Sequence, residues 1–173
     1  MSETEMGKGA CANRREFLLS GGITAAMMML GTKPMMAEAK VVGYPRKKIG
    51  KLSRLKSGRP IDFNYPDEDS ENILVKLSKP AGGGVGKNAN VVAFNKLCTH
   101  MGGTVTDGGY HHSDAVAGPC PFHLSTFDLS RHGMIVAGHA TQSLPQIQLE
   151  VKGDDIYAVG VMGLIYGRNK NLG

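Results

Sequence analysis

Two short segments of the chain each contain one cysteine and one histidine. The first is Cys98-Thr99-His100 and the second is Cys120-Pro121-Phe122-His123, which gives the spacings C-x-H and C-x-x-H. Residues 101–119 separate the two segments. Thiolate and imidazole groups are ligands for zinc and for iron–sulfur clusters. The four side chains therefore predict a metal centre that is built from two loops.

The mixed composition of each segment bears on which metal it binds. Two thiolates and two imidazoles could hold one tetrahedral zinc, but structural zinc sites usually pair like ligands, as C-x₂₋₄-C and H-x₃₋₅-H. Glycine and proline residues flank both segments, so the backbone can approach a bulky group closely. The pattern favours a [2Fe–2S] cluster with both cysteines on one iron and both histidines on the other. A small structural zinc module that mediates assembly stays open as an alternative of another class.

The combination of two thiolate and two imidazole ligands determines the expected reduction potential of such a cluster. Neutral imidazoles contribute less negative charge than thiolates, so such clusters have reduction potentials of about −150 to +300 mV, against about −400 mV with four thiolates. The ring nitrogens that do not bind iron can titrate, so electron uptake is expected to couple to proton uptake. Because protein ligands complete both irons, the sequence predicts electron transfer without catalytic residues on this chain.

The elements expected to position these loops are short β-strands. Alternating or short apolar patterns mark four stretches, residues 73–77, 91–94, 147–151 and 156–159. Residues 152–155 (KGDD) predict a hairpin turn, and the only helical pattern is a turn near residues 52–55. Residues 81–88 (AGGGVGKN) lack the first glycine and the final hydroxyl of a phosphate-binding loop, so we interpret them as a connection between strands. The sequence predicts an all-β sandwich or barrel.

The paired segments resemble the Rieske [2Fe–2S] family. The stretch from Gly118 to Asp128, GPCPFHLSTFD, is most similar to the Rieske small subunit of arsenite oxidase, and the likeness extends less specifically over most of the chain. The resemblance implies an antiparallel β domain with a small cluster-binding subdomain at about residues 95–130. It also implies that Cys98 and Cys120 bind the inner iron, and that His100 and His123 bind the outer, more exposed iron.

The resemblance further implies partners. In arsenite oxidase the small subunit pairs with a large catalytic subunit that holds a molybdopterin centre and a [3Fe–4S] cluster. Electrons from arsenite then pass through the Rieske cluster to a periplasmic cytochrome c or an azurin-type acceptor. The alternatives within the same cofactor class are the Rieske subunit of a quinol–cytochrome c oxidoreductase and the soluble ferredoxin of an aromatic-ring dioxygenase.

The sequence departs from the general Rieske pattern around the ligands. Many family members join the two loops by a disulfide at the positions of Gly103 and Phe122, so here the loops must be held by packing, in part by Phe122. Ser125 matches a serine that donates a hydrogen bond to a cluster sulfur in the respiratory enzymes. Phe127 replaces a tyrosine with the same role, and hydrogen bonds to sulfur stabilise the reduced cluster. We therefore predict a lower potential than in the respiratory enzymes.

Residues 1–39 resemble a Tat export signal. The pair Arg14-Arg15 precedes a weakly apolar stretch at residues 21–30, and residues 37–39 (AEA) offer small side chains at a cleavage-like spacing. We expect a periplasmic protein that folds around its cofactor before export, with membrane attachment only if this segment is retained as an anchor. Cys11 lies in this segment and is expected to have no functional role.

Charge is distributed unevenly over the predicted domain, residues 40–173. Lysine and arginine concentrate between residues 40 and 59, and an acidic stretch follows at residues 62–71, while the whole chain carries a formal net charge of +5. We interpret these runs as solvent-exposed edges, with docking to an acidic partner as the alternative. Nucleic-acid binding is not expected of an exported protein.

Overall fold

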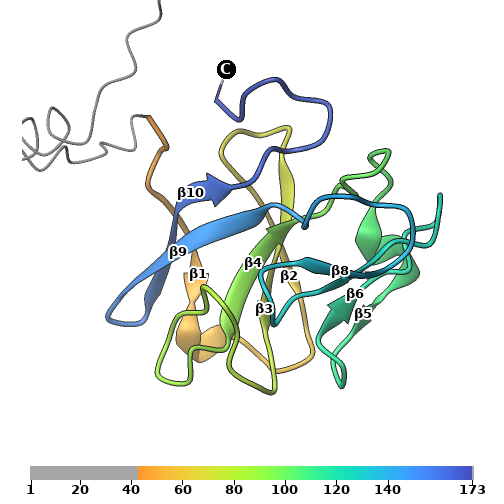
Figure 1. The fold of residues 1–173 in the computed structure, drawn as a ribbon. Coiled ribbons are helices and arrows are strands. Elements are labelled where there is room, and N and C mark those ends of the chain that lie inside the picture. Colours follow the sequence, from red (N-terminus) through yellow and green to blue (C-terminus); the bar gives the residue numbers. More distant parts are fainter. Residues whose placement is uncertain (1–42, 173) are drawn as a thin grey trace, which may run out of the picture. The chain divides into compact units, whose positions relative to one another are not determined.

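Ten short β-strands and two 3₁₀ turns make up residues 43–172, the part of the chain that the computed structural model describes (Figure 1). The predicted export segment, residues 1–39, and Cys11 lie outside the described residues. No α-helix occurs between residues 43 and 172, and no helical segment there has the length and apolarity that crossing a bilayer requires. The all-β prediction is confirmed.

The larger sheet has six antiparallel strands and curls into a nearly closed barrel (Figure 1). In spatial order they are β1 (Lys47–Lys51), β10 (Asp155–Met162), β9 (Gln146–Lys152), β4 (Val91–Asn95), β3 (Glu71–Lys76) and β2 (Ile61–Asn64). The predicted hairpin is confirmed, because Lys152 pairs with Asp155 across a turn that includes Gly153 at φ +62°. Strands β2, β3 and β4 follow each other in the sheet as they do in the chain.

The smaller sheet has four antiparallel strands and lies at one side of the barrel strands in Figure 1. In spatial order these are β5 (Tyr110–His111), β6 (Val116–Ala117), β7 (Thr126–Asp128) and β8 (Met134–Ala137). A 3₁₀ turn, η2 (Val105–Gly108), precedes β5. The sheet ends at Ala137, past the predicted limit of the cluster-binding subdomain near residue 130.

Strands β3 and β4 bury both of their faces, which divides the apolar core into two clusters. One face, with Ile73, Val92 and Phe94, packs against residues of the smaller sheet and its loops. The other face, with Leu74 and Ala93, packs inside the barrel against β9 and β10. Every residue of β4 is buried, so the predicted buried strand at residues 91–94 is confirmed.

The two remaining predicted connections are also present. A 3₁₀ turn, η1 (Leu52–Arg54), follows β1 where the sequence predicts a turn. Residues 81–88 join β3 to β4 through turns and lead into a strand, so they lack the helix that a phosphate-binding loop opens. In the basic run, Arg46, Lys47 and Lys48 form ion pairs with Glu150, Glu68 and Asp155 at the surface of the barrel.

Candidate metal centre

The first predicted ligand segment lies in loop 1 (residues 97–104), which leaves the end of β4 at a buried pair of asparagines. Asn95 Nδ2 donates a hydrogen bond of 3.1 Å to Asn72 Oδ1, and the two residues face each other across β4 and β3. Asn95 Oδ1 in turn accepts a hydrogen bond of 3.0 Å from the backbone N–H of Leu97. Because buried polar groups are costly unless paired, this network fixes the direction in which loop 1 leaves the sheet.

Loop 1 closes on itself through two backbone hydrogen bonds around Cys98. The N–H of Cys98 donates to the carbonyl of Gly103 at 2.8 Å, and the N–H of Gly102 donates to the carbonyl of Cys98 at 2.8 Å. Gly102 has φ +72°, in the left-handed region that glycine adopts without steric cost. The turn therefore holds the Cys98 side chain inward.

Loop 2 (residues 119–125), between β6 and β7, repeats this arrangement. The N–H of Cys120 donates to the carbonyl of Ser125 at 2.8 Å, and the N–H of Leu124 donates to the carbonyl of Cys120 at 2.9 Å. Leu124 has φ +60°, at the position that corresponds to Gly102. The two loops thus share one backbone plan, although their histidines stand two and three residues after the cysteine.

The two predicted cysteine ligands are brought together in the interior. Cys98 and Cys120 are each 1% exposed and carry free thiols, and their sulfurs lie close enough to interact. Burial, together with the neighbouring Cys98 thiol, raises the pKa of the Cys120 thiol above its ordinary value, and the backbone N–H groups of Phe122 and His123 partly offset this rise. These two N–H groups stabilise negative charge on the sulfur, as a thiolate ligand requires.

The two predicted histidine ligands are brought together nearer to the surface. The rings of His100 and His123 meet edge to face with centroids 4.6 Å apart. His100 is half-buried and His123 is exposed, whereas the cysteines are buried. The Nδ1 atom of His100 is buried and has no hydrogen-bond partner among the described residues. A buried nitrogen without a partner is unfavourable in itself but suits a metal ligand.

His139 joins this pair, which the sequence did not predict. Its ring centroid lies 5.8 Å from that of His100 and 6.2 Å from that of His123. His139 has no cysteine at the spacing of the two ligand segments, so the sequence predicts only a surface or loop role for it. It reaches the metal centre because the N–H groups of His139 and Ala140 donate to Ser125 Oγ at 3.2 and 3.1 Å.

The residues predicted to tune the centre differ in their surroundings. Ser125 is fully buried at the end of loop 2, and its hydroxyl oxygen accepts the two N–H groups just described. Phe127 is also fully buried, on β7, in the apolar cluster that contains Cys98 and Cys120. A phenylalanine ring in this cluster offers no hydrogen-bond donor.

Gly103 and Phe122, at the positions where many Rieske proteins carry a disulfide, face each other across the two loops. A Cβ atom on Gly103 would lie 3.0 Å from Cγ of Phe122 and 2.8 Å from the sulfur of Cys120. Only glycine therefore lets loop 1 pass so close to loop 2. The ring of Phe122 is 60% exposed, however, so it supplies less of the expected packing between the loops than a buried ring would.

The remaining histidines of the described chain lie away from the ligand pairs. His111 Nε2 contacts the carbonyl of Gly118 at 2.9 Å, just before loop 2. His112 contacts Ser57 Oγ and Tyr110 Oη, and His132 Nδ1 contacts Gln146 Oε1 at 2.7 Å. None of these histidines has a cysteine at the spacing of the two ligand segments, so the sequence predicts surface or loop roles for them.

The arrangement fits a bridged pair of irons better than a single metal ion. Between residues 43 and 172, no group of three or more Cys, His, Asp or Glu side chains is gathered as a single metal ion requires. The structure instead holds two sulfurs inside and two imidazoles outside, and a [2Fe–2S] cluster of this class takes two protein ligands on each iron.

Comparison with known proteins gives concordant results. A family model for the Rieske [2Fe-2S] domain matches residues 46–148. Iodate reductase subunit IdrB of Denitromonas iodatirespirans is 59% identical over 166 residues, which cover 95% of this chain and 89% of that protein. The same subunit from Pseudomonas sp. (strain SCT) is 56% identical over 164 residues, 93% of this chain and 85% of that protein. Among solved structures, the soluble domain of Rieske protein II from Sulfolobus acidocaldarius superposes with a TM-score of 0.62 at 26% identity, covering 70% of this chain and 80% of that one.

Proposed function

Because this chain belongs to the Rieske [2Fe–2S] domain family, we propose that it is the electron-transfer subunit of an iodate reductase. Its cofactor is a Rieske-type [2Fe–2S] cluster, which accepts and releases one electron at a time. The observation that carries the proposal is the pairing of two buried cysteines with two outward histidines on two loops of the same backbone plan. The similarity of nearly the whole chain to iodate reductase subunits supports the choice of substrate.

Four side chains are assigned as ligands in this proposal. Cys98 and Cys120 hold the inner iron, and His100 and His123 hold the outer iron, nearer the surface. The oxygen of Ser125 already accepts two N–H groups, which occupy its two lone pairs. Its proton has no acceptor among the described side chains and backbone groups, so it is free to donate to a sulfur of the cluster.

The face around these ligands supports docking to a catalytic subunit through apolar contact. Three stretches of chain contain no Asp, Glu, Lys or Arg, residues 97–106, 115–127 and 133–149. At the loop tips Met101, Phe122 and Leu124 are 52%, 60% and 64% exposed. Exposed apolar residues gathered at one place mark interaction surfaces, and charges are depleted at the centre of stable interfaces.

The electron path in this proposal runs toward the oxyanion. His100 and His123 would hold the cluster near the surface, where it could take electrons from a periplasmic cytochrome c or azurin-type protein and supply them to a molybdopterin catalytic subunit that reduces iodate. Residues 1–39 would direct the folded chain to that compartment, and would anchor it to the membrane if they are retained. Reduction of iodate to iodide consumes several electrons and protons, so the carrier must turn over repeatedly for each substrate molecule.

Arsenite oxidation is the second candidate, in which electrons flow in the opposite direction through the same cluster. The stretch GPCPFHLSTFD, which contains loop 2, favours it, because this stretch resembles the arsenite oxidase small subunit. The two candidates share the cluster, the ligands and the type of catalytic partner, and differ in the substrate of that partner.

Co-expression of this chain with its catalytic subunit separates the two candidates. With a reduced viologen dye as the electron donor, the purified complex is expected to oxidise the dye when iodate is added. With a reduced cytochrome as the donor, the His123→Ala variant is expected to lose most of the iodate-dependent activity. Arsenite-dependent reduction of an oxidised dye, without iodate turnover, would overturn the iodate assignment and favour the second candidate.

A further inference from the structure

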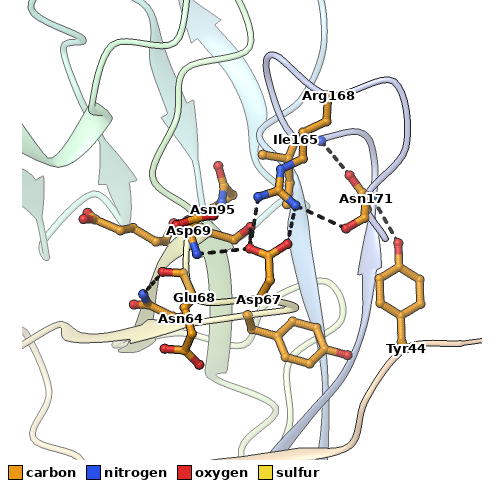
Figure 2. A network of polar contacts seen from close by, with 12 residues as sticks. Tyr44, Asn64, Asp67, Glu68, Asp69, Asn95, Ile165, Arg168 and Asn171 are labelled. Atoms are coloured by element: carbon orange, nitrogen blue, oxygen red, sulfur yellow. Dashed lines mark hydrogen bonds and ion pairs between the residues drawn. The ribbon is translucent and has the colours of Figure 1, made fainter. Parts of the chain in front are cut away.

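The chain continues after β10 as a C-terminal segment, residues 163–172, and Figure 2 shows Ile165, Arg168 and Asn171 of this segment. Asn171 fixes the shape of this segment from within. Its Nδ2 atom donates to the carbonyl of Gly163 at 2.7 Å, and its Oδ1 atom accepts from the N–H of Ile165 at 2.9 Å. Ile165 is buried, so the segment has a small apolar anchor as well as these polar ones.

An ion pair attaches the C-terminal segment to the turn between β2 and β3. Arg168 donates to both carboxylate oxygens of Asp67, from Nη1 at 2.5 Å and from Nη2 at 3.0 Å (Figure 2). This bidentate geometry is the strongest form of an arginine–carboxylate pair. Asn171 Nδ2 also donates to Tyr44 Oη at 3.0 Å, which ties the segment to the start of the described chain.

Between these attachments, the segment places the ring of Tyr166 directly on loop 1. A Cβ atom on Gly102 would lie 2.6 Å from Cδ1 and 2.7 Å from Cε1 of Tyr166, so the ring occupies the space that a side chain would need. The N–H of Gly102 is the group that closes the turn around Cys98. Tyr166 therefore covers the peptide on which the position of the first cysteine depends.

We infer that the C-terminal segment holds loop 1 against the metal centre, and that Tyr166 is a positioning residue for Cys98 and His100. This inference rests on the proposed ligand set. The contact between Tyr166 and Gly102 would hold loop 1 in place although no disulfide joins Gly103 and Phe122. Loop 2 has no such cover, because Leu124, which corresponds to Gly102, is 64% exposed.

The first test compares Tyr166→Ala with Tyr166→Phe in the full chain carrying its cluster. The Tyr166 hydroxyl makes no hydrogen bond to the described residues, so phenylalanine keeps the contact and serves as the matched control. Loss of visible absorbance in the presence of an iron chelator is expected to be about tenfold faster in Tyr166→Ala, the size of effect usual for removing one packed side chain. The Tyr166→Phe variant is expected to stay within about twofold of the parent. The g-values of the reduced cluster should shift only in the alanine variant.

A double-mutant cycle tests the contact between Tyr166 and Gly102 directly. Its result can be interpreted even if Tyr166→Ala lowers the stability of the fold. Gly102→Ala should accelerate cluster loss strongly in the parent and less in the Tyr166→Ala background, because removing the ring leaves only the cost of the positive φ. Additive effects of the two substitutions would show that Tyr166 and Gly102 do not interact.

The ion pair offers a third variant, Asp67→Asn, with Glu150→Gln as its control, since Arg46 and Glu150 form an exposed pair on the barrel. Hydrogen exchange of residues 98–104 should become faster in Asp67→Asn alone, while residues 120–126 stay unchanged. Equal cluster loss in Tyr166→Ala and Tyr166→Phe would overturn the inference. A parent chain without any [2Fe–2S] spectrum would instead overturn the ligand set on which it rests.

Discussion

Loop 1 and loop 2 close with the same two backbone hydrogen bonds, yet different parts of the molecule hold them in place. Loop 1 is fixed from outside by the Tyr166 ring on Gly102, and from inside by the buried asparagine pair at the end of β4. Loop 2 is fixed from inside, by the Ser125 hydroxyl that accepts two N–H groups from the chain after β8. Buried hydrogen bonds therefore support both copies of one backbone plan, and loop 1 has in addition a ring packed on its outer side.

The different supports of the two loops also explain why glycine stands at the left-handed position of loop 1 and leucine at that of loop 2. In loop 1 the approaching ring leaves no room for a side chain, so Gly102 is required on two grounds, its φ and its surroundings. In loop 2 the corresponding Leu124 points to solvent and accepts an unfavourable φ of +60°. Its exposed side chain is available to a partner, which gives a reason to keep it.

The largest change in stability is expected when the residue at the left-handed position of each loop is replaced. Gly102→Ala should lower the free energy of unfolding by about 2–4 kcal/mol, because it combines an unfavourable left-handed backbone with a clash against the Tyr166 ring. The reciprocal Leu124→Gly should stay within about 1 kcal/mol of the parent, since relief of the backbone offsets the entropy of glycine. Thermal unfolding of both variants measures this asymmetry, and equal losses would contradict it.

Removing the internal support of loop 2 should have the next largest effect. Ser125→Ala leaves the buried N–H of Ala140 without an acceptor, which costs about 1–3 kcal/mol. It also removes the proposed donor to the cluster, so the reduction potential should fall by roughly 50 mV. Redox titration followed by EPR measures the second effect, and Ser125→Thr, which keeps the hydroxyl, is the control. An unchanged reduction potential in Ser125→Ala would show that the Ser125 hydroxyl does not donate a hydrogen bond to the cluster.

A donor can also be added on β7, the strand that follows loop 2. Phe127→Tyr supplies a hydroxyl in the apolar cluster that contains both cysteines, and a hydrogen bond to sulfur would stabilise the reduced state. The potential is expected to rise by roughly 30–60 mV, the equivalent of about one hydrogen bond. A titration that shows a fall, with the EPR signal otherwise intact, would contradict the expected direction.

The smallest effect concerns the external support of loop 1 and depends on pH. The hydrogen bonds from Arg168 lower the pKa of Asp67 to about 2 from an ordinary value near 3.8. The carboxylate thus contributes stability above about pH 4, and this contribution disappears as the pH falls toward 2. Because the pair is partly exposed, we expect at most about 1 kcal/mol from it.

Unfolding temperatures of the parent and Asp67→Asn should therefore differ at pH 7 and converge as the pH is lowered to 3 and below. Glu150→Gln controls for the general loss of a surface ion pair. A gap between parent and Asp67→Asn that is independent of pH would show that the charge on Asp67 does not stabilise the C-terminal segment.

The elements that could be predicted are those whose pattern lies within a few consecutive residues of the sequence. Alternation over several residues revealed β3, β9 and β10, and the burial of both faces made β4 visible as an apolar run. Strands β5 and β6 have two residues each, which is too short for alternation to show. The four predicted ligand residues were proposed from their chemistry and spacing, and the fold brings them together in two pairs.

The contacts that the sequence did not predict are those between distant segments. His139 reaches the metal centre through hydrogen bonds from the chain after β8 to Ser125, and nothing in its own neighbours indicates this. Tyr166 covers Gly102 because an ion pair far from loop 1 fixes the C-terminal segment. Phe122 was expected to pack the loops together and is instead 60% exposed, which its place in the sequence does not indicate.

The central claim is that Cys98, His100, Cys120 and His123 hold a pair of bridged irons. Iron and acid-labile sulfide should be measured in the purified chain, made with both available, together with the EPR spectrum after reduction. The account predicts two irons and two sulfides per chain and a rhombic signal, all of which are lost in Cys120→Ser. A single metal atom without labile sulfide would contradict it.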